Sequence, residues 1–107
     1  METISLMGVA SYMPPNIVEN SFFQRGSDHS ENMFKGVVRR RHIAADESAD
    51  SMIEKAADKL IKQLNLKPEE DIDIILTNVS MPDQLFTGCG AVVAKRLGAK
   101  PKMIIDL

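Results

Sequence analysis

The clearest hydrophobic pattern in the chain is a helical repeat over residues 48–64. Apolar positions recur every three or four residues on one face, and charged residues fill the opposite face. Ser48 is a typical N-cap residue, and Asp50 follows it near the positive end of the helix dipole. Asn65 can adopt the left-handed backbone that closes a helix, and Pro68 prevents its continuation. The pattern predicts an amphipathic helix that docks on a sheet.

Two apolar runs on either side of a second helical pattern predict strands. Residues 72–79 are β-branched and largely apolar, and residues 103–107 repeat this character. Between them, Thr87 is expected to cap a helix that continues to Leu97 and closes at Gly98. We therefore expect two strands that are buried on both faces and joined by a helix.

The first part of the chain has a weaker pattern. Residues 4–12 are mostly apolar with small residues among them, which predicts a buried strand with close backbone approach at Gly8, ended by Pro14 and Pro15. Residues 16–31 show no clean period and predict a short helix or loop over the core. The order strand, loop, helix, strand, helix, strand is typical of an α/β layer structure with a mainly parallel sheet.

Composition narrows the class of protein. The chain has 107 residues, of which 44% are hydrophobic and 26% charged, so wholesale disorder is excluded. The net charge of -2 disfavours a general nucleic-acid binder, and the apolar runs are too short to span a bilayer. The N-terminus lacks the pattern of a secretory signal peptide, and the single cysteine, Cys89, cannot form an internal disulfide. We therefore expect a cytoplasmic protein that binds neither membrane nor nucleic acid.

The most basic stretch of the chain leaves two interpretations open. It consists of Lys35, Arg39, Arg40 and Arg41. The arginines can pair with local carboxylates on a solvated edge. Alternatively, the stretch can bind an anion, such as the phosphate groups of a cofactor or the acidic surface of a carrier. A nucleic-acid patch is disfavoured because no aromatic residues alternate with these charges.

The common catalytic motifs are absent, and Cys89 is the main candidate for chemistry. The sequence contains no phosphate-binding glycine loop, no Gly-x-Ser-x-Gly turn and no cysteine and histidine spacing typical of a metal site. Cys89 falls in the first turn of the second predicted helix, where the helix dipole favours a thiolate. Its neighbours Gly88, Gly90 and Ala91 indicate close packing instead, so a small buried residue is favoured over a nucleophile.

Several local strings, taken in their order and spacing, resemble the β-ketoacyl-acyl carrier protein synthase III enzymes of the thiolase superfamily. Helix 48–64 resembles their first long helix, and the remaining strings are Met7–Pro14, Gly36–Val37, Arg41–Ala44, Ile72–Leu76, Met81–Asp83, Leu97–Gly98 and Ile105–Leu107. The resemblance covers essentially the whole chain. It implies that residues 1–107 form the N-terminal part of a thiolase-like layered α/β/α fold, an incomplete ketosynthase domain.

The resemblance also implies a chemistry. In these enzymes a cysteine takes an acyl group from a thioester, and a Claisen-type condensation follows, in fatty-acid or polyketide-like biosynthesis. The pattern places that cysteine a few residues beyond Leu107, and Cys89 does not match it. We therefore expect no catalytic residue and no metal in this chain, and no acyl transfer by residues 1–107 alone. No cofactor is expected to stay bound, because coenzyme A or phosphopantetheine thioesters are substrates.

Two binding roles follow from the same resemblance. Phe86 matches a position that reaches across a homodimer towards the partner's acyl pocket, with Leu85 and Thr87 as neighbours. The family often holds coenzyme A with a tryptophan, but this chain has none, and Phe34 and Lys35 occupy that neighbourhood. The missing tryptophan strengthens the case for an acyl carrier protein as the donor, and acyl-coenzyme A remains the alternative. The basic stretch would suit either an acidic carrier or phosphopantetheine.

A second hypothesis belongs to another class of protein. The last apolar strand runs to Leu107 with no turn or polar tail after it. Open strand edges invite association. The chain can therefore also be a non-catalytic binding or assembly subunit that completes its sheet with another chain.

Overall fold

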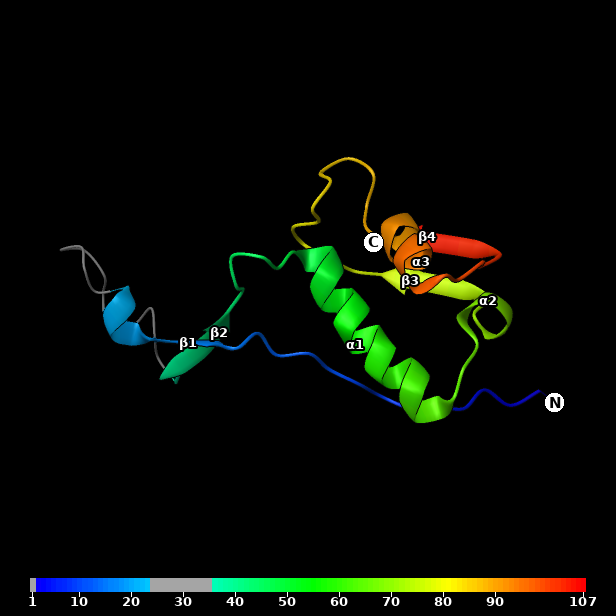
Figure 1. Cartoon of the computed structure of the whole chain (residues 1–107), viewed down its shortest axis with the longest axis horizontal. Coiled ribbons are helices and arrows are strands. Elements are labelled where there is room, and N and C mark those ends of the chain that lie inside the picture. The colour runs from blue at the N-terminus through cyan, green and yellow to red at the C-terminus, as the bar shows by residue number, and fades with distance from the viewer. Residues whose placement is uncertain (1, 24–35) are drawn as a thin grey trace. The chain divides into compact units, whose positions relative to one another are not determined.

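The computed structural model describes residues 2–23 and 36–107 (Figure 1). The chain divides into two compact units. One holds the segment that ends at Tyr12 together with Ser48–Leu107, and the other holds Met13–Glu47. Within the described ranges, no helix is both long enough and apolar enough to cross a bilayer.

Helix α1, Ala49–Leu64, begins and ends where the sequence predicts. The Ser48 hydroxyl accepts a hydrogen bond from the Ser51 N–H at 3.2 Å, and Ser51 Oγ accepts one from the Ser48 N–H at 2.9 Å. This reciprocal pair satisfies two N–H groups that an open helix start would leave free. Asn65 closes the helix in the left-handed conformation, with φ 53°. The short helix α2, Pro68–Asp71, follows.

Strands β3, Ile74–Thr77, and β4, Met103–Asp106, form a parallel pair, and helix α3, Gly90–Leu97, connects them (Figure 1). The parallel β-α-β order confirms the α/β prediction for this part of the chain. Gly98 ends α3 with φ 68°, also as predicted. The predicted N-cap is wrong: Cys89 occupies that position, and the Thr87 hydroxyl donates to the Gln84 side chain at 2.9 Å instead.

The prediction that β3 and β4 are buried on both faces is wrong for the structure described. Ile74 and Leu76 are 60% and 61% exposed, and Met103 is also exposed. Helix α3 packs on the strand pair, with Val93 and Ala94 among its buried residues. An apolar strand sequence indicates that other elements can pack on both faces of the strand. It does not ensure that a second element is present to pack on the other face. The strand pair consequently keeps an exposed apolar surface.

The predicted strand over residues 4–12 is also wrong. This segment is extended, but it pairs with no strand among the described residues. It runs beside α1 (Figure 1): the Lys59 ammonium donates to the Ser11 carbonyl at 2.9 Å, and a Cβ on Gly8 would lie 2.9 Å from Leu60 Cδ1. The expected close approach at Gly8 is therefore confirmed. A strand requires a neighbouring strand, and here the neighbour is a helix.

The second unit contains an antiparallel strand pair that the sequence analysis did not predict. Strand β1, Asn16–Glu19, pairs with β2, Arg39–His42, and the short 3-10 helix η1, Asn20–Phe22, follows β1. The expected short helix or loop over residues 16–31 is therefore right only for η1, and residues 24–31 lie outside the described part. Four residues are too few to show a strand period, so β1 is defined by its distant partner.

Candidate functional site

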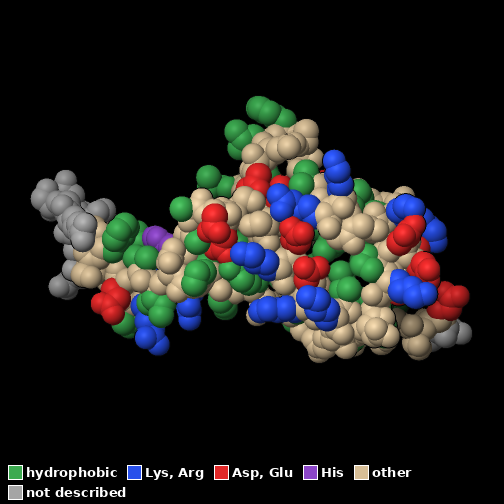
Figure 2. All heavy atoms as spheres, viewed as in Figure 1, with side chains coloured by type: hydrophobic (Ala, Val, Ile, Leu, Met, Phe, Trp, Pro, Cys, Tyr) green, Lys and Arg blue, Asp and Glu red, His purple; other side chains and the backbone are tan. Residues whose placement is uncertain are grey.

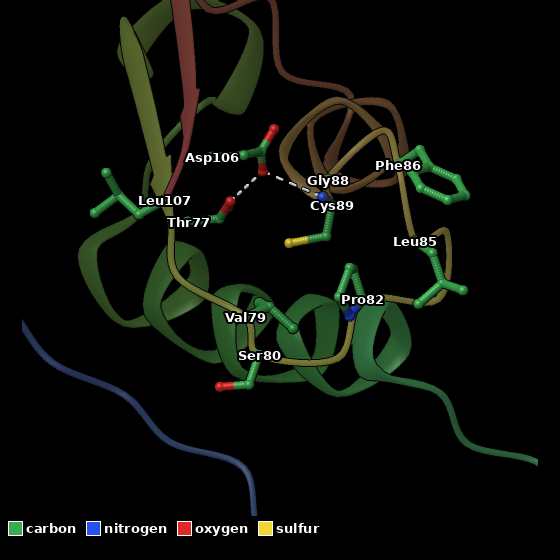
Figure 3. Close-up of a pocket in the computed structure, with 10 residues that line it drawn as sticks. All are labelled: Thr77, Val79, Ser80, Pro82, Leu85, Phe86, Gly88, Cys89, Asp106 and Leu107. Atoms are coloured by element: carbon green, nitrogen blue, oxygen red, sulfur yellow. Dashed lines mark hydrogen bonds between the residues drawn. The ribbon is translucent and has the colours of Figure 1, made fainter.

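A pocket of about 280 Å³ opens at the carboxyl ends of β3 and β4 (Figure 3). Parallel strands end at the same edge of a sheet, and the loops that follow them form a crevice there, where open α/β sheets usually bind ligands. The loop that follows β3 lies over this edge. The pocket is lined by Thr77, Val79, Ser80, Pro82, Leu85, Phe86, Gly88, Cys89, Asp106 and Leu107.

The Asp106 carboxylate ties β4, β3 and α3 together in this pocket. Asp106 lies opposite Thr77 in the strand register, and the Thr77 hydroxyl donates to its Oδ1 atom. The same oxygen accepts the N–H of Cys89 at 3.1 Å (Figure 3) and the N–H of Gly90 at 2.8 Å. The Thr77 hydrogen bond, and then the backbone ones, lower the pKa of Asp106 below its ordinary value. A carboxylate from a distant strand thus caps α3, the role expected of Thr87.

The glycines on either side of Cys89 let the backbone approach this carboxylate. Gly88 has φ 67°, in the left-handed region, and a Cβ there would overlap Asp106 Cγ. A Cβ on Gly90 would overlap the Ile104 side chain and lie 3.1 Å from Asp106 Oδ1. The close packing that these glycines indicated is confirmed.

The Cys89 side chain is only 1% exposed. Figure 3 shows its sulfur turned towards the side of the pocket formed by Thr77 and Val79. This burial is the property that a packing residue requires. A nucleophile, in contrast, has to reach the carbonyl carbon of an incoming thioester.

The loop between β3 and α3 brings two of the three predicted acyl-contact residues to the pocket. Leu85 and Phe86 both line it, although they are 76% and 98% exposed. Figure 2 shows hydrophobic side chains on this loop, at the top of the view. Phe86 points outwards from the pocket (Figure 3). Thr87 does not line the pocket, because its hydroxyl is directed to Gln84.

The basic stretch lies in the second unit, where Arg39, Arg40 and Arg41 belong to β2. With Met13 and Ile17 they line a pocket of about 340 Å³. Lys35 and Phe34 lie outside the described residues. The structure therefore brings the three arginines to one concave surface.

Local groups hold two of these arginines in place. Arg40 Nη2 donates to the Asn20 side chain at 2.8 Å, and its guanidinium lies 4.6 Å from the centre of the Phe23 ring. Arg41 Nη1 donates to the carbonyls of Pro14 and Pro15, both at 3.2 Å. The Arg41 guanidinium is thus restrained by two backbone carbonyls, and the Arg40 guanidinium by an amide oxygen and an aromatic ring.

The sequence analysis missed Thr77 and Asp106 as site residues. Each is a single polar residue at the end of an apolar strand, and nothing in the local pattern shows that the two strands are neighbours. The Gly-Cys-Gly string at 88–90 was the available signal, since it indicates a backbone packed closely on something. For metals, the described ranges contain no group of three or more His, Cys, Asp or Glu that could hold an ion.

The chain is similar to curated proteins over its whole length. No protein-family model matches the chain. The β-ketoacyl-[acyl-carrier-protein] synthase III of Clostridium acetobutylicum is 30% identical over 109 residues, which cover 100% of this chain and 33% of that protein. The synthase III of Fusobacterium nucleatum is 27% identical over 110 residues, with the same coverage of 100% and 33%. The chain thus spans about a third of the length of the curated relatives it matches.

Solved structures agree with the sequence relatives. The β-ketoacyl-[acyl carrier protein] synthase III of Thermus thermophilus has a TM-score of 0.79 and 26% identity, with 97% of this chain and 33% of that chain covered. A priming β-ketosynthase from a polyketide biosynthetic pathway has a TM-score of 0.77 and 25% identity, with 94% and 30% covered. The resemblance to the β-ketoacyl synthase III enzymes is therefore confirmed over the whole chain, which has the thiolase-like α/β fold of about a third of such an enzyme.

Proposed function

We propose that this chain forms part of an acyltransferase of the 3-oxoacyl-(acyl carrier protein) synthase III type. Such an enzyme performs a Claisen-type condensation of acyl thioesters in fatty-acid or polyketide-like biosynthesis. One observation carries the proposal: relatives named for this activity match the chain over 100% of its length. The pocket at the ends of β3 and β4 supports it, because that is where an α/β sheet presents its ligand.

In this proposal the loop after β3 contacts the acyl chain. Leu85 and Phe86 place apolar side chains at the pocket, where an acyl chain can cover them and remove their surface from water. Phe86 points outwards, as a residue that serves the pocket of a second copy in a homodimer must. Thr87 acts as a neighbour that shapes the loop through Gln84. Asp106 holds the start of α3 in place by accepting the Cys89 and Gly90 N–H groups.

The basic pocket of the second unit is proposed to contact the thioester carrier. Arg39, Arg40 and Arg41 line it, and guanidinium groups bind phosphate well because they donate two parallel hydrogen bonds. Lys35, four residues before Arg39 in the sequence, is proposed to contact the same carrier. The partner in this proposal is an acyl carrier protein with its phosphopantetheine, or acyl-coenzyme A, and the location is the cytoplasm.

Cys89 is not the acyl-accepting cysteine in this proposal. Its thiol is 1% exposed and packed at the start of α3, so a thioester carbonyl carbon does not reach it. The nucleophile is then another cysteine of the complete active site. Residues 1–107 alone are accordingly proposed to transfer no acyl group.

One observation favours a second candidate function. The exposed apolar side chains of β3 and β4 need a cover, which another chain could supply to a non-catalytic assembly subunit. The intact mass of the natural protein separates the candidates. A species that ends at Leu107 supports the assembly subunit, and a much longer species supports the acyltransferase.

Acyl binding at this loop is testable by titrating a short acyl-coenzyme A into the isotope-labelled protein and following amide signals by NMR. We expect shifts at Gly88 and Leu107 that free coenzyme A does not produce. Phe86→Ala should weaken binding of the acyl form about fivefold, because roughly 1 kcal/mol of apolar contact is lost. Ile4→Ala, which removes another exposed apolar side chain away from both pockets, is the control and should leave binding unchanged. Identical shifts with and without the acyl group would contradict the proposal.

A further inference from the structure

The loop that carries Leu85 and Phe86 is fastened at its base to helix α1. Asp83, within this loop, accepts the N–H of Ala49 on Oδ1 at 3.0 Å and the N–H of Asp50 on Oδ2 at 3.2 Å. Both N–H groups belong to the first turn of the helix, where no intrahelical acceptor exists for them. A carboxylate at this end of a helix is also favoured by the helix dipole. Asp83 therefore holds the loop against α1.

A second carboxyl group faces this contact from the helix itself. The Asp50 side chain is only 3% exposed, and its Oδ1 atom receives no hydrogen bond from any donor in the part of the chain that the structure describes. Asp83 lies directly against this residue, because its Oδ2 atom accepts the Asp50 N–H at 3.2 Å, and the negative charge of Asp83 acts on the Asp50 carboxyl group. Two ionised carboxylates in contact repel each other, and a buried one without a donor is strongly disfavoured. If one of the two carboxyl groups is protonated, the repulsion between two negative charges disappears. The buried carboxyl group is then also no longer ionised without a hydrogen-bond donor.

The surroundings decide which group carries that proton. The Ser48 hydroxyl, and then the backbone N–H groups of Asp50 and Ala49 that bind its two oxygens, lower the pKa of Asp83. Burial, and then the charge of Asp83, raise the pKa of Asp50. Arg96 on α3 opposes this through its positive charge, but its guanidinium is hydrogen-bonded to Glu54 at 2.9 Å. Of the two groups, Asp50 therefore keeps its proton to the higher pH, and in that form it can donate a hydrogen bond to ionised Asp83.

We propose that protonated Asp50 is a positioning residue that locks Asp83, and with it the Leu85–Phe86 loop, onto the start of α1. Ionisation of Asp50 places two negative charges in contact and loosens the lock. This lock, the contact of Asp83 with the start of α1, is thus strongest at low pH and weakens as the pH rises through the raised pKa of Asp50. The lock itself does not depend on the proposed function; only its consequence for acyl contact by Phe86 does.

Amide hydrogen exchange tests the lock directly. Between the ordinary aspartate pKa of the opened state and the raised pKa of Asp50 in the closed state, the protection factors of the Ala49 and Asp50 amides should fall by about tenfold per pH unit, because each opening releases one proton in this range. The substitution Asp50→Asn should remove this dependence and keep the protection, since the neutral amide can still donate to Asp83. Asp58→Asn, the same change on an exposed position of α1, should keep the dependence of the unmodified protein.

The carbon-13 shifts of the aspartate carboxyl groups provide a second readout that needs no variant. Asp50 should titrate at higher pH than aspartate does in an unfolded peptide, and Asp83 at lower pH. Titration of Asp50 at the unfolded-peptide value would overturn the proposal, and so would an Asp50→Asn protein that keeps the pH dependence of exchange. Neither readout is an activity, so failure of the lock leaves the acyltransferase proposal standing.

Discussion

The substitution Gly88→Ala is expected to lower the free energy of unfolding by about 3 kcal/mol. Gly88 has φ 67°, and an L-residue in this left-handed region costs about 1–2 kcal/mol. The new methyl group would also overlap Asp106 Cγ, and forced overlap of this kind costs about 1–3 kcal/mol. Asp106 has little freedom to move away, because Thr77, Cys89 and Gly90 all bind its Oδ1 atom. Urea denaturation of both proteins at neutral pH measures the difference.

Gly98 provides a matched control for this experiment. It has nearly the same backbone angle, φ 68°, but nothing lies within 4 Å of the position that a Cβ would take. The substitution Gly98→Ala should therefore cost only the conformational part, about 1 kcal/mol. Equal losses for Gly88→Ala and Gly98→Ala would show that the backbone at Gly88 is not packed against Asp106.

Acid should destabilise the protein through Asp106, and Asp106→Asn should remove that part of the effect. The pKa of Asp106 is lowered in the folded state by its Thr77 and backbone hydrogen bonds, so the unfolded chain binds the proton more readily. The resulting stabilisation is complete above the unfolded pKa of about 3.9 and is lost as the pH falls through the folded pKa. The melting temperature of the unmodified protein should therefore fall more steeply below pH 4 than that of the variant.

The same variant should also melt at a lower temperature at pH 7. Asparagine keeps an acceptor oxygen but loses the charge that strengthens three hydrogen bonds and complements the start of α3. Asp58→Asn removes an exposed carboxylate from α1 and should change neither the slope nor the neutral melting temperature appreciably. Parallel pH profiles for Asp106→Asn and the unmodified protein would show that the Asp106 charge does not contribute.

Elements with local signals could be predicted from the sequence, and elements that depend on distant partners could not. Helix α1 has its cap at Ser48, its apolar period and its stop at Asn65 within one short stretch, and all three are found in the structure. Strand β1 has no such signals, because its partner β2 begins 20 residues after it ends, at Arg39. Thr87 looked like a helix cap by local rules, but Asp106 outcompetes it from another strand.

The residues of the candidate site also divide into those that a local signal or a resemblance indicates and those that depend on a distant partner. The resemblance to a known family, rather than local chemistry, drew attention to Phe86 and Leu85. Asp106 and Thr77 went unnoticed because each is an ordinary polar residue until the parallel register places them opposite each other. The contact between Asp83 and Asp50 spans 33 positions, and no spacing rule connects a loop aspartate to the first turn of an earlier helix.

We propose that this chain forms part of a synthase III-type acyltransferase, and a chimaera tests this proposal most directly. The matching segment of the Clostridium acetobutylicum synthase III is replaced by this chain, and thiol release from acyl-coenzyme A is measured in the presence of a carrier-protein thioester. A cooperative thermal melt establishes that the chimaera is folded. We predict condensation activity that falls about tenfold in kcat/KM with Phe86→Ala and changes by less than about twofold with Cys89→Ala. A folded chimaera without condensation activity, or one inactivated by Cys89→Ala, would contradict the account.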